Sequence, residues 1–206
     1  MYFGGERVKI IGLCGGSGSG KGAVSHAFSS LGIPSIDADA VYRDLTAKGS
    51  PLLETLKNEF GADIITDDGE LDRKRLSALV FSESGRSKLL PVLNSITHSA
   101  VIAETLRRIE SLRESGVPAV IFDAPQLFES GFDKSCDVII AVIADKEKRI
   151  ERIIKRDMIS RERALARIDS QLSDQYLIER SHYTIINNGS EDDLKKEVVF
   201  VAEKIL

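Results

Sequence analysis

Short apolar runs rich in β-branched residues alternate along the chain with longer segments of helical periodicity. This alternation is typical of βα units built around a parallel sheet. The first, third and fourth of the short runs are continuously apolar, which predicts central strands that helices cover on both faces. The pattern therefore predicts an α/β fold with a five-stranded parallel sheet flanked by helices. The predicted strands are Val8–Cys14, Pro34–Ile36, Ala119–Asp123, Asp137–Ile143 and Tyr183–Asn187.

The segment between the second and third predicted strands is too long for a simple connection. Such a connection usually has roughly 2 to 6 residues, whereas this segment covers residues 38–116 and has helical periodicity. Within it, helices are predicted at Pro51–Phe60, Asp72–Phe81 and Arg86–Glu114, the last as a helical region with an interruption. A second helical and basic stretch, Lys146–Glu179, follows the fourth strand, and its outer part is predicted to be a lid.

These segments predict one domain with two elaborations. The domain covers residues 1–206, with a core of residues 1–37, 117–145 and 181–206, an inserted helical subdomain of residues 38–116 and a lid region of residues 146–180.

The composition narrows the classes of partner. The 206 residues are 42% hydrophobic, enough to bury one substantial core, and the formal net charge is −4. An acidic chain does not favour nucleic acid or a membrane surface, so a small solute is the better hypothesis for the partner. The apolar run in MYFGGERVKIIGL is shorter than the roughly 20 residues that a membrane helix needs, which predicts a cytoplasmic protein. Cys14 and Cys136 fall in apolar runs and are interpreted as reduced core residues.

The sequence GGSGSGKG directly follows the first predicted strand and opens a helical segment that runs to Leu31. It matches the pattern GxxxxGK in the context that a phosphate-binding loop, or P-loop, requires. Glycines let successive backbone N–H groups converge on a phosphate, and the helix N-terminus adds partial positive charge. Lys21 is placed to span the β- and γ-phosphates, although a plain glycine-rich turn is the alternative. The residues predicted to bind the nucleotide are Gly16, Ser17, Gly18, Ser19, Gly20, Lys21, Gly22 and Ala23.

The residue after the loop lysine departs from the usual pattern. This position normally carries Ser or Thr, whose hydroxyl binds Mg²⁺, but here Gly22 is followed by Ala23. Magnesium would then be held by water, by the phosphates or by a more distant group. Asp123, at the end of the third predicted strand, is placed like the carboxylate that helps to hold the metal in P-loop enzymes. It is the candidate metal ligand, with a structural cap at the strand end as the alternative.

Two carboxylates follow the second predicted strand. Asp37 and Asp39 fall at the carboxyl edge of the sheet, where ligands bind in open α/β folds. A carboxylate there can accept the proton of an attacking hydroxyl and orient it in line with a γ-phosphate. Helix capping is the alternative role for an aspartate in this position. We assign Asp37 to capping and strand-end contacts, and Asp39 to catalysis.

Arginines crowd the stretch after the fourth predicted strand. On a helix, Arg149, Arg152 and Arg156 would share one stripe. For most of these arginines the default interpretation is the solvated face of an amphipathic helix. Phosphoryl transfer, however, needs cations on the transferring oxygens, and Arg152 and Arg156 are the candidates for that role. Asn187, at the end of the last strand, is the candidate for contact with adenine, although a plain turn is nearly as well supported.

Six segments, taken in order, resemble one known family. They are GLCGGSGSGKG, LGIPSIDAD, DGELDRKRLSALVF, PQLFESG, RIIKRDMISRERALARIDSQ and IINNGS. Their combination and spacing are similar to those of the dephospho-CoA kinases along nearly the whole chain. The resemblance implies a P-loop kinase core with a helical CoA-binding insertion and a lid. It also implies an enzyme that phosphorylates the ribose 3′-hydroxyl of dephospho-CoA with ATP, which completes coenzyme A.

The resemblance also suggests roles for individual residues. It implies that Asp39 is the base, that Gly18–Ala23 contact ATP, and that Arg73 and His98 contact the acceptor substrate. The chain departs from the family where Ser99 follows His98 in place of the usual proline. It departs again where Gln126 and Leu127 replace the usual pair of leucines.

Two other functions are compatible with parts of the sequence. A nucleoside monophosphate kinase is suggested by the letters GKG, but the long insertion with its DGELDR segment argues against it. A nucleotide-binding regulatory protein without catalysis is suggested by the missing hydroxyl. The presence of Lys21, Asp39, Asp123 and the lid arginines argues against that second alternative. The sequence carries no signal for an oligomeric state.

Overall fold

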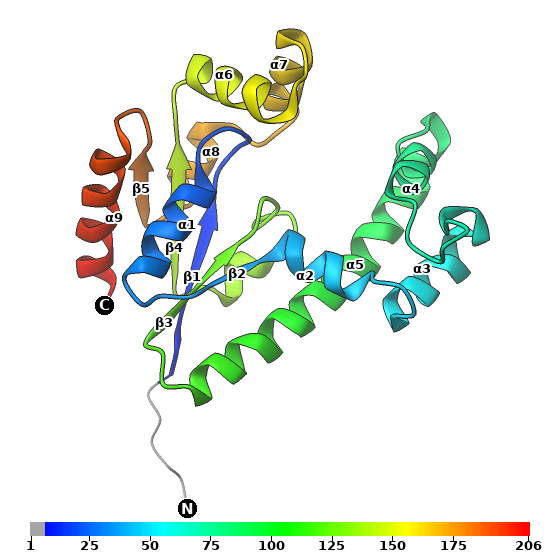
Figure 1. Cartoon of the computed structure of the whole chain (residues 1–206), viewed down its shortest axis with the longest axis horizontal. Helices are drawn as coiled ribbons and strands as arrows, with labels where there is room; N and C mark the ends of the chain where they lie inside the picture. The colour runs from blue at the N-terminus through cyan, green and yellow to red at the C-terminus, as the bar shows by residue number, and fades with distance from the viewer. Residues whose placement is uncertain (1–6) are drawn as a thin grey trace, which may run out of the picture. The chain divides into compact units, whose positions relative to one another are not determined.

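The computed structural model describes residues 7–206 and contains a five-stranded parallel sheet (Figure 1). The strands pair in the order β2-β3-β1-β4-β5, so the first strand of the chain lies at the centre. All five predicted strands are present with ends that differ by at most one residue, and the predicted α/β sheet is confirmed. The strands are β1 (Lys9–Cys14), β2 (Ser35–Asp37), β3 (Ala119–Asp123), β4 (Val138–Ile143) and β5 (Tyr183–Ile186).

Helices connect the strands, and local capping sets where several of them begin. A serine hydroxyl accepts a hydrogen bond from the backbone N–H three residues on at Ser50, Ser160, Ser173 and Ser190. Such a cap satisfies an N–H group that has no partner within the helix. The helices are α1 (Lys21–Ser30), α2 (Ala38–Leu45), α3 (Pro51–Phe60), α4 (Arg73–Val80), α5 (Glu83–Glu114), α6 (Lys146–Asp157), α7 (Arg161–Asp169), α8 (Asp174–Glu179) and α9 (Glu191–Ile205), with 3₁₀ turns at Ala62–Ile64 and Phe132–Ser135.

The chain divides into two compact units, which we call the core unit and the inserted unit. The inserted unit is Ala38–Arg108, and the core unit comprises the described residues up to Asp37 together with Ile109–Leu206. In the core unit, α1 and α9 cover one face of the sheet. Phe28 of α1 and Val198 of α9 are fully buried there. Burying a side chain of this size contributes about 1.5–3 kcal/mol.

The opposite face of the sheet is covered partly by the segment that follows β3. The rings of Phe122 and Phe132 lie 4.3 Å apart between centroids, and Leu127 is buried beside them.

Both cysteines of the chain are free thiols. Burial raises the pKa of Cys14 to about 11 and that of Cys136 to about 12. Neither thiol is therefore ionised to a useful extent near neutral pH.

The inserted unit has its own hydrophobic cluster, formed by α3, α4 and the first half of α5. Leu53 and Leu56 of α3 and Leu76 of α4 are buried in it, and Leu89 and Leu93 of α5 pack against it. A unit with a separate cluster can hold its shape without borrowing side chains from the sheet.

The interruption predicted in the last helix of the insertion is wrong, because α5 runs unbroken over Glu83–Glu114. Pro91 lies inside it, where proline removes one backbone hydrogen bond and costs about 3 kcal/mol. The residues on either side, Leu90 and Val92, pack against the cluster of the inserted unit. This burial offsets the cost of the proline, so the helix continues through it.

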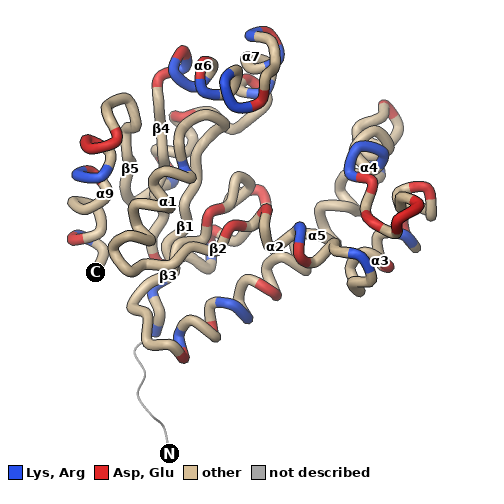
Figure 2. Tube along the Cα trace, in the orientation of Figure 1, with Lys and Arg blue, Asp and Glu red and all other residues tan. Residues whose placement is uncertain are grey.

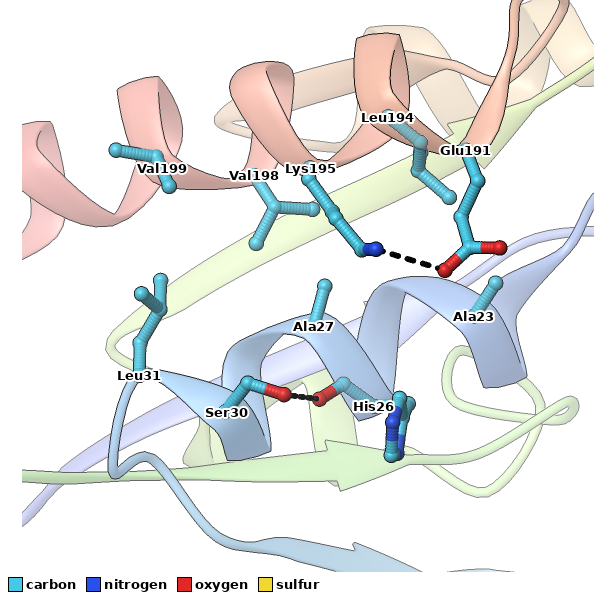
Figure 3. A pocket seen from close by; sticks show the side chains of 10 residues that line it. All are labelled: Ala23, His26, Ala27, Ser30, Leu31, Glu191, Leu194, Lys195, Val198 and Val199. Carbon is cyan, nitrogen blue, oxygen red and sulfur yellow. Dashed lines mark hydrogen bonds and ion pairs between the residues drawn. The ribbon is translucent and has the colours of Figure 1, made fainter.

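A surface groove of about 420 Å³ runs between α1 and α9 (Figure 3). Its lining is mostly apolar, and its two oppositely charged groups, Glu191 and Lys195, pair with each other at 2.8 Å.

None of the helices within residues 7–206 combines the length and apolar character that crossing a bilayer takes. Residues 1–6 of the N-terminal run considered above lie outside the described part of the chain.

Candidate active site

The predicted phosphate-binding loop connects β1 at the centre of the sheet to α1. Gly20 is the residue that precedes the first turn of α1, and its φ of 98° is a conformation that favours glycine. Unlike the serine-capped helices, α1 has no side-chain hydrogen bond at its N-terminus and no acidic residue in its first turn. Its first N–H groups and its partial positive charge are therefore available to an anion such as a phosphate.

Lys21 extends back across this loop. Its Nζ atom donates to the carbonyl of Gly15 at 3.3 Å and lies 3.9 Å from Oδ1 of Asp123. Both side chains are mostly covered, with exposed fractions of 14% and 16%. The contact with Asp123 keeps the charge of the lysine compensated, and places an ammonium and a carboxylate together beside the loop.

The outer side of the loop is held by side chains from distant segments. Arg152 of α6 donates to the carbonyls of Gly18 at 3.1 Å and Ser19 at 3.3 Å. The side-chain amide of Asn187 donates to the same Ser19 carbonyl at 2.8 Å. In a trans peptide unit the C=O and N–H point in opposite directions, so anchoring a carbonyl outward turns the next N–H inward. The N–H of Gly20 is thereby directed into the loop.

The structure also determines the contacts of the other predicted lid residues. Lysines and arginines are frequent along α6 and α7 (Figure 2), but they make different contacts. Arg152 also donates to the carbonyl of Asn187 at 2.9 Å, so these two predicted site residues contact each other as well as the loop. Arg156 instead pairs with Asp157 at 2.7 Å and is 62% exposed. Asp157 in turn pairs with Arg167, and these two arginine side chains hold its pKa well below the usual range.

Two residues of this arrangement were not found from the sequence. Arg149 is 4% exposed and donates from Nε to the carbonyl of Ser17 at 2.9 Å, so the solvated-face interpretation is wrong for it. Gln171 accepts from the N–H of Ser17 at 2.8 Å and donates to its hydroxyl at 3.2 Å. Residue type alone gives no signal here, because both contacts join positions more than 130 residues apart in sequence.

Two carboxylates end neighbouring strands on the side of the sheet that faces α1. Asp37 of β2 and Asp123 of β3 are register partners in the parallel pair, so their side chains share one face. Ser35, two residues before Asp37, bonds to Ser25 of α1 at 2.7 Å, which identifies that face. Asp37 therefore lies level with the candidate metal ligand.

This donor set fits magnesium only in part. Carboxylate oxygens suit Mg²⁺, which commonly takes one or two carboxylates and completes its shell with water and substrate phosphates. Asp123 can provide such an oxygen, whereas Gly22 and Ala23 provide no hydroxyl. Within residues 7–206, no three histidine, cysteine or carboxylate side chains gather closely enough to hold a metal ion by themselves. The residues fit a metal held mainly by phosphates and water, with one protein carboxylate.

The remaining predicted residues belong to the inserted unit. Asp39 is exposed in the first turn of α2, two residues beyond the end of β2. Arg73 begins α4, donates to Thr46 at 2.9 Å and lies 4.9 Å from the ring centroid of Tyr42. His98 is half-buried within α5. Arg73 and His98 are thus on different helices of the same unit.

Comparison with known proteins gives the family. The model of the dephospho-CoA kinase family matches residues 9–193. The chain belongs to the dephospho-CoA kinase family. A dephospho-CoA kinase of Carboxydothermus hydrogenoformans is 37% identical over 195 residues, which cover 95% of this chain and 93% of that protein. The family expected from the sequence is confirmed, and with it the function of a kinase in the last step of coenzyme A biosynthesis.

Solved structures of similar proteins agree with this fold. The crystal structure of a Thermus thermophilus protein is 31% identical and superposes with a TM-score of 0.80, covering 98% of this chain and all of the other. A dephospho-CoA kinase from Campylobacter jejuni is 26% identical, with a TM-score of 0.68 and coverage of 95% and 96%. The predicted P-loop kinase fold is confirmed by these similarities.

Proposed function

We propose that the chain transfers the γ-phosphoryl group of ATP to the ribose 3′-hydroxyl of dephospho-CoA. Besides family membership, the observation that carries this proposal is the loop between β1 and α1. The uncapped N-terminus of α1 and the outward anchoring of the Gly18 and Ser19 carbonyls prepare an anion site, with Lys21 across it. Positioned donors of this kind are the main source of catalysis in phosphoryl transfer.

In this proposal the loop residues Gly16–Ala23 take the phosphates of ATP, and Lys21 spans the β- and γ-phosphates. Arg152 and Asn187 support the loop through the Ser19 carbonyl that both of them contact. Arg152 and Arg156 supply positive charge to the transferring oxygens, and Arg156 exchanges its exposed pairing with Asp157 for that contact. An exposed pair of this type contributes only about 0–1 kcal/mol, so the exchange costs little.

Asp39 acts as the general base in this proposal. Its carboxylate accepts the proton of the 3′-hydroxyl as that oxygen forms a bond to the γ-phosphorus, while the bond from the phosphorus to the ADP oxygen breaks. Its support is its place: it lies in the exposed first turn of α2, just beyond the carboxyl end of β2. Ligands of open α/β folds bind at that edge of the sheet.

Asp123 is proposed to hold Mg²⁺ together with water and the ATP phosphates. When bound, the ion neutralises charge on the phosphate oxygens. The carboxylate of Asp123 also orients Lys21 through their 3.9 Å contact. Because the protein supplies few oxygens of its own, the affinity for the ion depends on the nucleotide that accompanies it.

We assign the acceptor to the inserted unit, with Arg73 and His98 as contacts. The guanidinium of Arg73 is fixed by Thr46, whose side chain is buried, and by the ring of Tyr42. A cation that is already held in place loses less freedom when it binds an anionic substrate.

A cytoplasmic location is proposed as well, and the two free thiols support it because disulfides are rare in that compartment.

The function is tested by measuring ADP release with different acceptors. With saturating ATP, dephospho-CoA is expected to give turnover far above the rate without an acceptor, whereas AMP and UMP give none above that rate. Turnover with AMP or UMP but not with dephospho-CoA would favour the nucleoside monophosphate kinase. Nucleotide binding without turnover on any acceptor would favour the regulatory protein.

The missing P-loop hydroxyl leads to a prediction about Gly22. This residue is exposed in the first turn of α1 and its φ is not positive. A Cβ atom there would meet nothing within 4 Å. The substitution Gly22→Ser is therefore expected to raise stability by up to about 1 kcal/mol, because glycine loses more backbone entropy on folding. It should also lower the Mg²⁺ concentration needed for half-maximal activity, since a hydroxyl replaces a loosely held water.

The matched control is Gly22→Ala, which changes the backbone entropy without adding a hydroxyl. Thermal unfolding without nucleotide should show similar stabilisation for both variants, and the Mg²⁺ titration should separate them. If both variants need the same Mg²⁺ concentration as the original chain, a protein group already holds the metal at that position.

A further inference from the structure

Arg149 carries a buried charge that the proposed mechanism does not use. It is 4% exposed in α6, and a buried guanidinium is tolerated only where it is paired and hydrogen-bonded. Its NH1 group donates to Oδ1 of Asp174 at 2.8 Å, and its Nε donates to the Ser17 carbonyl at 2.9 Å. One side chain therefore joins the first residue of α8 to the phosphate-binding loop.

The loop is shaped to receive this side chain. A Cβ atom at Gly16 would collide with the guanidinium of Arg149. One at Gly18 would lie 2.6 Å from the backbone oxygen of Arg149 and 2.9 Å from its Cα. Part of the glycine content of the loop thus allows α6 to approach its outer side, in addition to any need for close approach to phosphate.

Ser17 is fixed at three atoms by this outer layer. Its carbonyl accepts from Arg149, while its N–H and its hydroxyl bond to Gln171 in the segment before α8. With the Ser17 carbonyl held outward, the N–H of Gly18 is directed to the opposite side of the peptide unit. Within residues 7–206 that N–H donates to no protein acceptor, which leaves it for a ligand.

We propose that Arg149, balanced by Asp174, is a positioning residue for nucleotide binding that connects α6 and α8 to the peptide unit between Ser17 and Gly18. Its guanidinium sets the direction of one loop N–H before the phosphates arrive, and Asp174 sets the direction of the guanidinium. The inference rests on the proposed function, because it assumes that this loop receives the phosphates of ATP. It concerns the affinity for nucleotide and not the transfer step.

The substitution Arg149→Gln removes the positive charge and the guanidinium that bonds to Ser17 and Asp174. It is expected to weaken ADP binding about tenfold to a hundredfold, the range for losing a hydrogen bond from a charged donor together with its partner. The KM for ATP should rise by a similar factor, while the KM for dephospho-CoA stays within about threefold. A merely structural role would not separate the two substrates in this way.

The measurements are calorimetric ADP binding, steady-state kinetics for each substrate and thermal unfolding of the full chain. Arg149→Lys keeps the charge but cannot reach both partners, so it should not restore ADP affinity. Arg161→Gln is the matched control, because Arg161 is an exposed arginine that pairs with Glu147, and the change should leave ADP binding unchanged. Asp174→Asn should weaken ADP binding less than Arg149→Gln does. The variant that carries both substitutions should bind ADP with no lower affinity than Arg149→Gln alone.

ADP affinity within twofold of the original chain in a folded Arg149→Gln variant would overturn the proposal, as would equal rises in both KM values. If that variant does not fold, Asp174→Asn decides: weakened ADP binding supports the proposal and unchanged binding overturns it. Failure of the original chain to bind ADP would contradict the proposed function instead, so the two failures are distinguishable.

Discussion

The variant Asp39→Asn is expected to lower turnover by about 10²- to 10⁴-fold, the contribution of a positioned general base. Asparagine keeps the size of the side chain but cannot accept the proton of the attacking hydroxyl. Binding of ADP should be nearly unchanged, because the base acts on the acceptor and not on the nucleotide. The measurement is kcat at saturating ATP and dephospho-CoA, with calorimetric binding of ADP beside it.

A matched control for this variant is Asp63→Asn. Asp63 is an exposed aspartate of the inserted unit, in the 3₁₀ turn that follows α3, and has no assigned role. Its replacement should leave kcat unchanged. A kcat for Asp39→Asn within about threefold of the original would rule out the assignment of the base.

Replacement of Lys21 by methionine should lower kcat/KM for ATP by about 10²- to 10³-fold, the usual loss when one preorganised electrostatic donor is removed. Methionine keeps most of the length of the side chain but has no charge to place on the β- and γ-phosphates. It also leaves the carboxylate of Asp123 without its cationic neighbour at 3.9 Å. Steady-state kinetics in ATP, at saturating dephospho-CoA, measure the effect.

Lys195→Met provides the comparison, because Lys195 pairs with Glu191 in the groove between α1 and α9. That variant should keep its kcat/KM. A loss of less than fivefold for Lys21→Met would mean that other cations hold the transferring phosphate, and Arg152 would then be the first to examine.

Features that depend on neighbouring residues in the chain could be predicted from the sequence. The strands end within one residue of their predicted bounds because most of them are short apolar runs rich in β-branched residues. The loop was recognised for a similar reason, since its glycines and Lys21 stand directly between a strand and a helix. The serine at position 50, with proline after it, likewise marks the start of α3 from local capping chemistry.

Features that depend on distant segments could not be predicted. Arg149 has the residue type of a solvated helix face, yet the loop at the other end of the chain buries it. The helical region Arg86–Glu114 was predicted with an interruption, and only the cluster supplied by α3 and α4 shows why α5 continues through Pro91. In both cases tertiary contacts outweigh the local preference, and a single sequence does not record those contacts.

The two free thiols of this enzyme can report how often its core opens. Cys14 ends β1 immediately before the loop and is buried, whereas Cys136 lies just before β4 and is only partly buried. With pKa values of about 11 and 12, both thiols react slowly with alkylating reagents while the protein is folded. Alkylation of the buried Cys14 by a reagent such as iodoacetamide therefore follows the rate at which the core is exposed. Stabilisation by a bound nucleotide can be read from that rate without introducing a label.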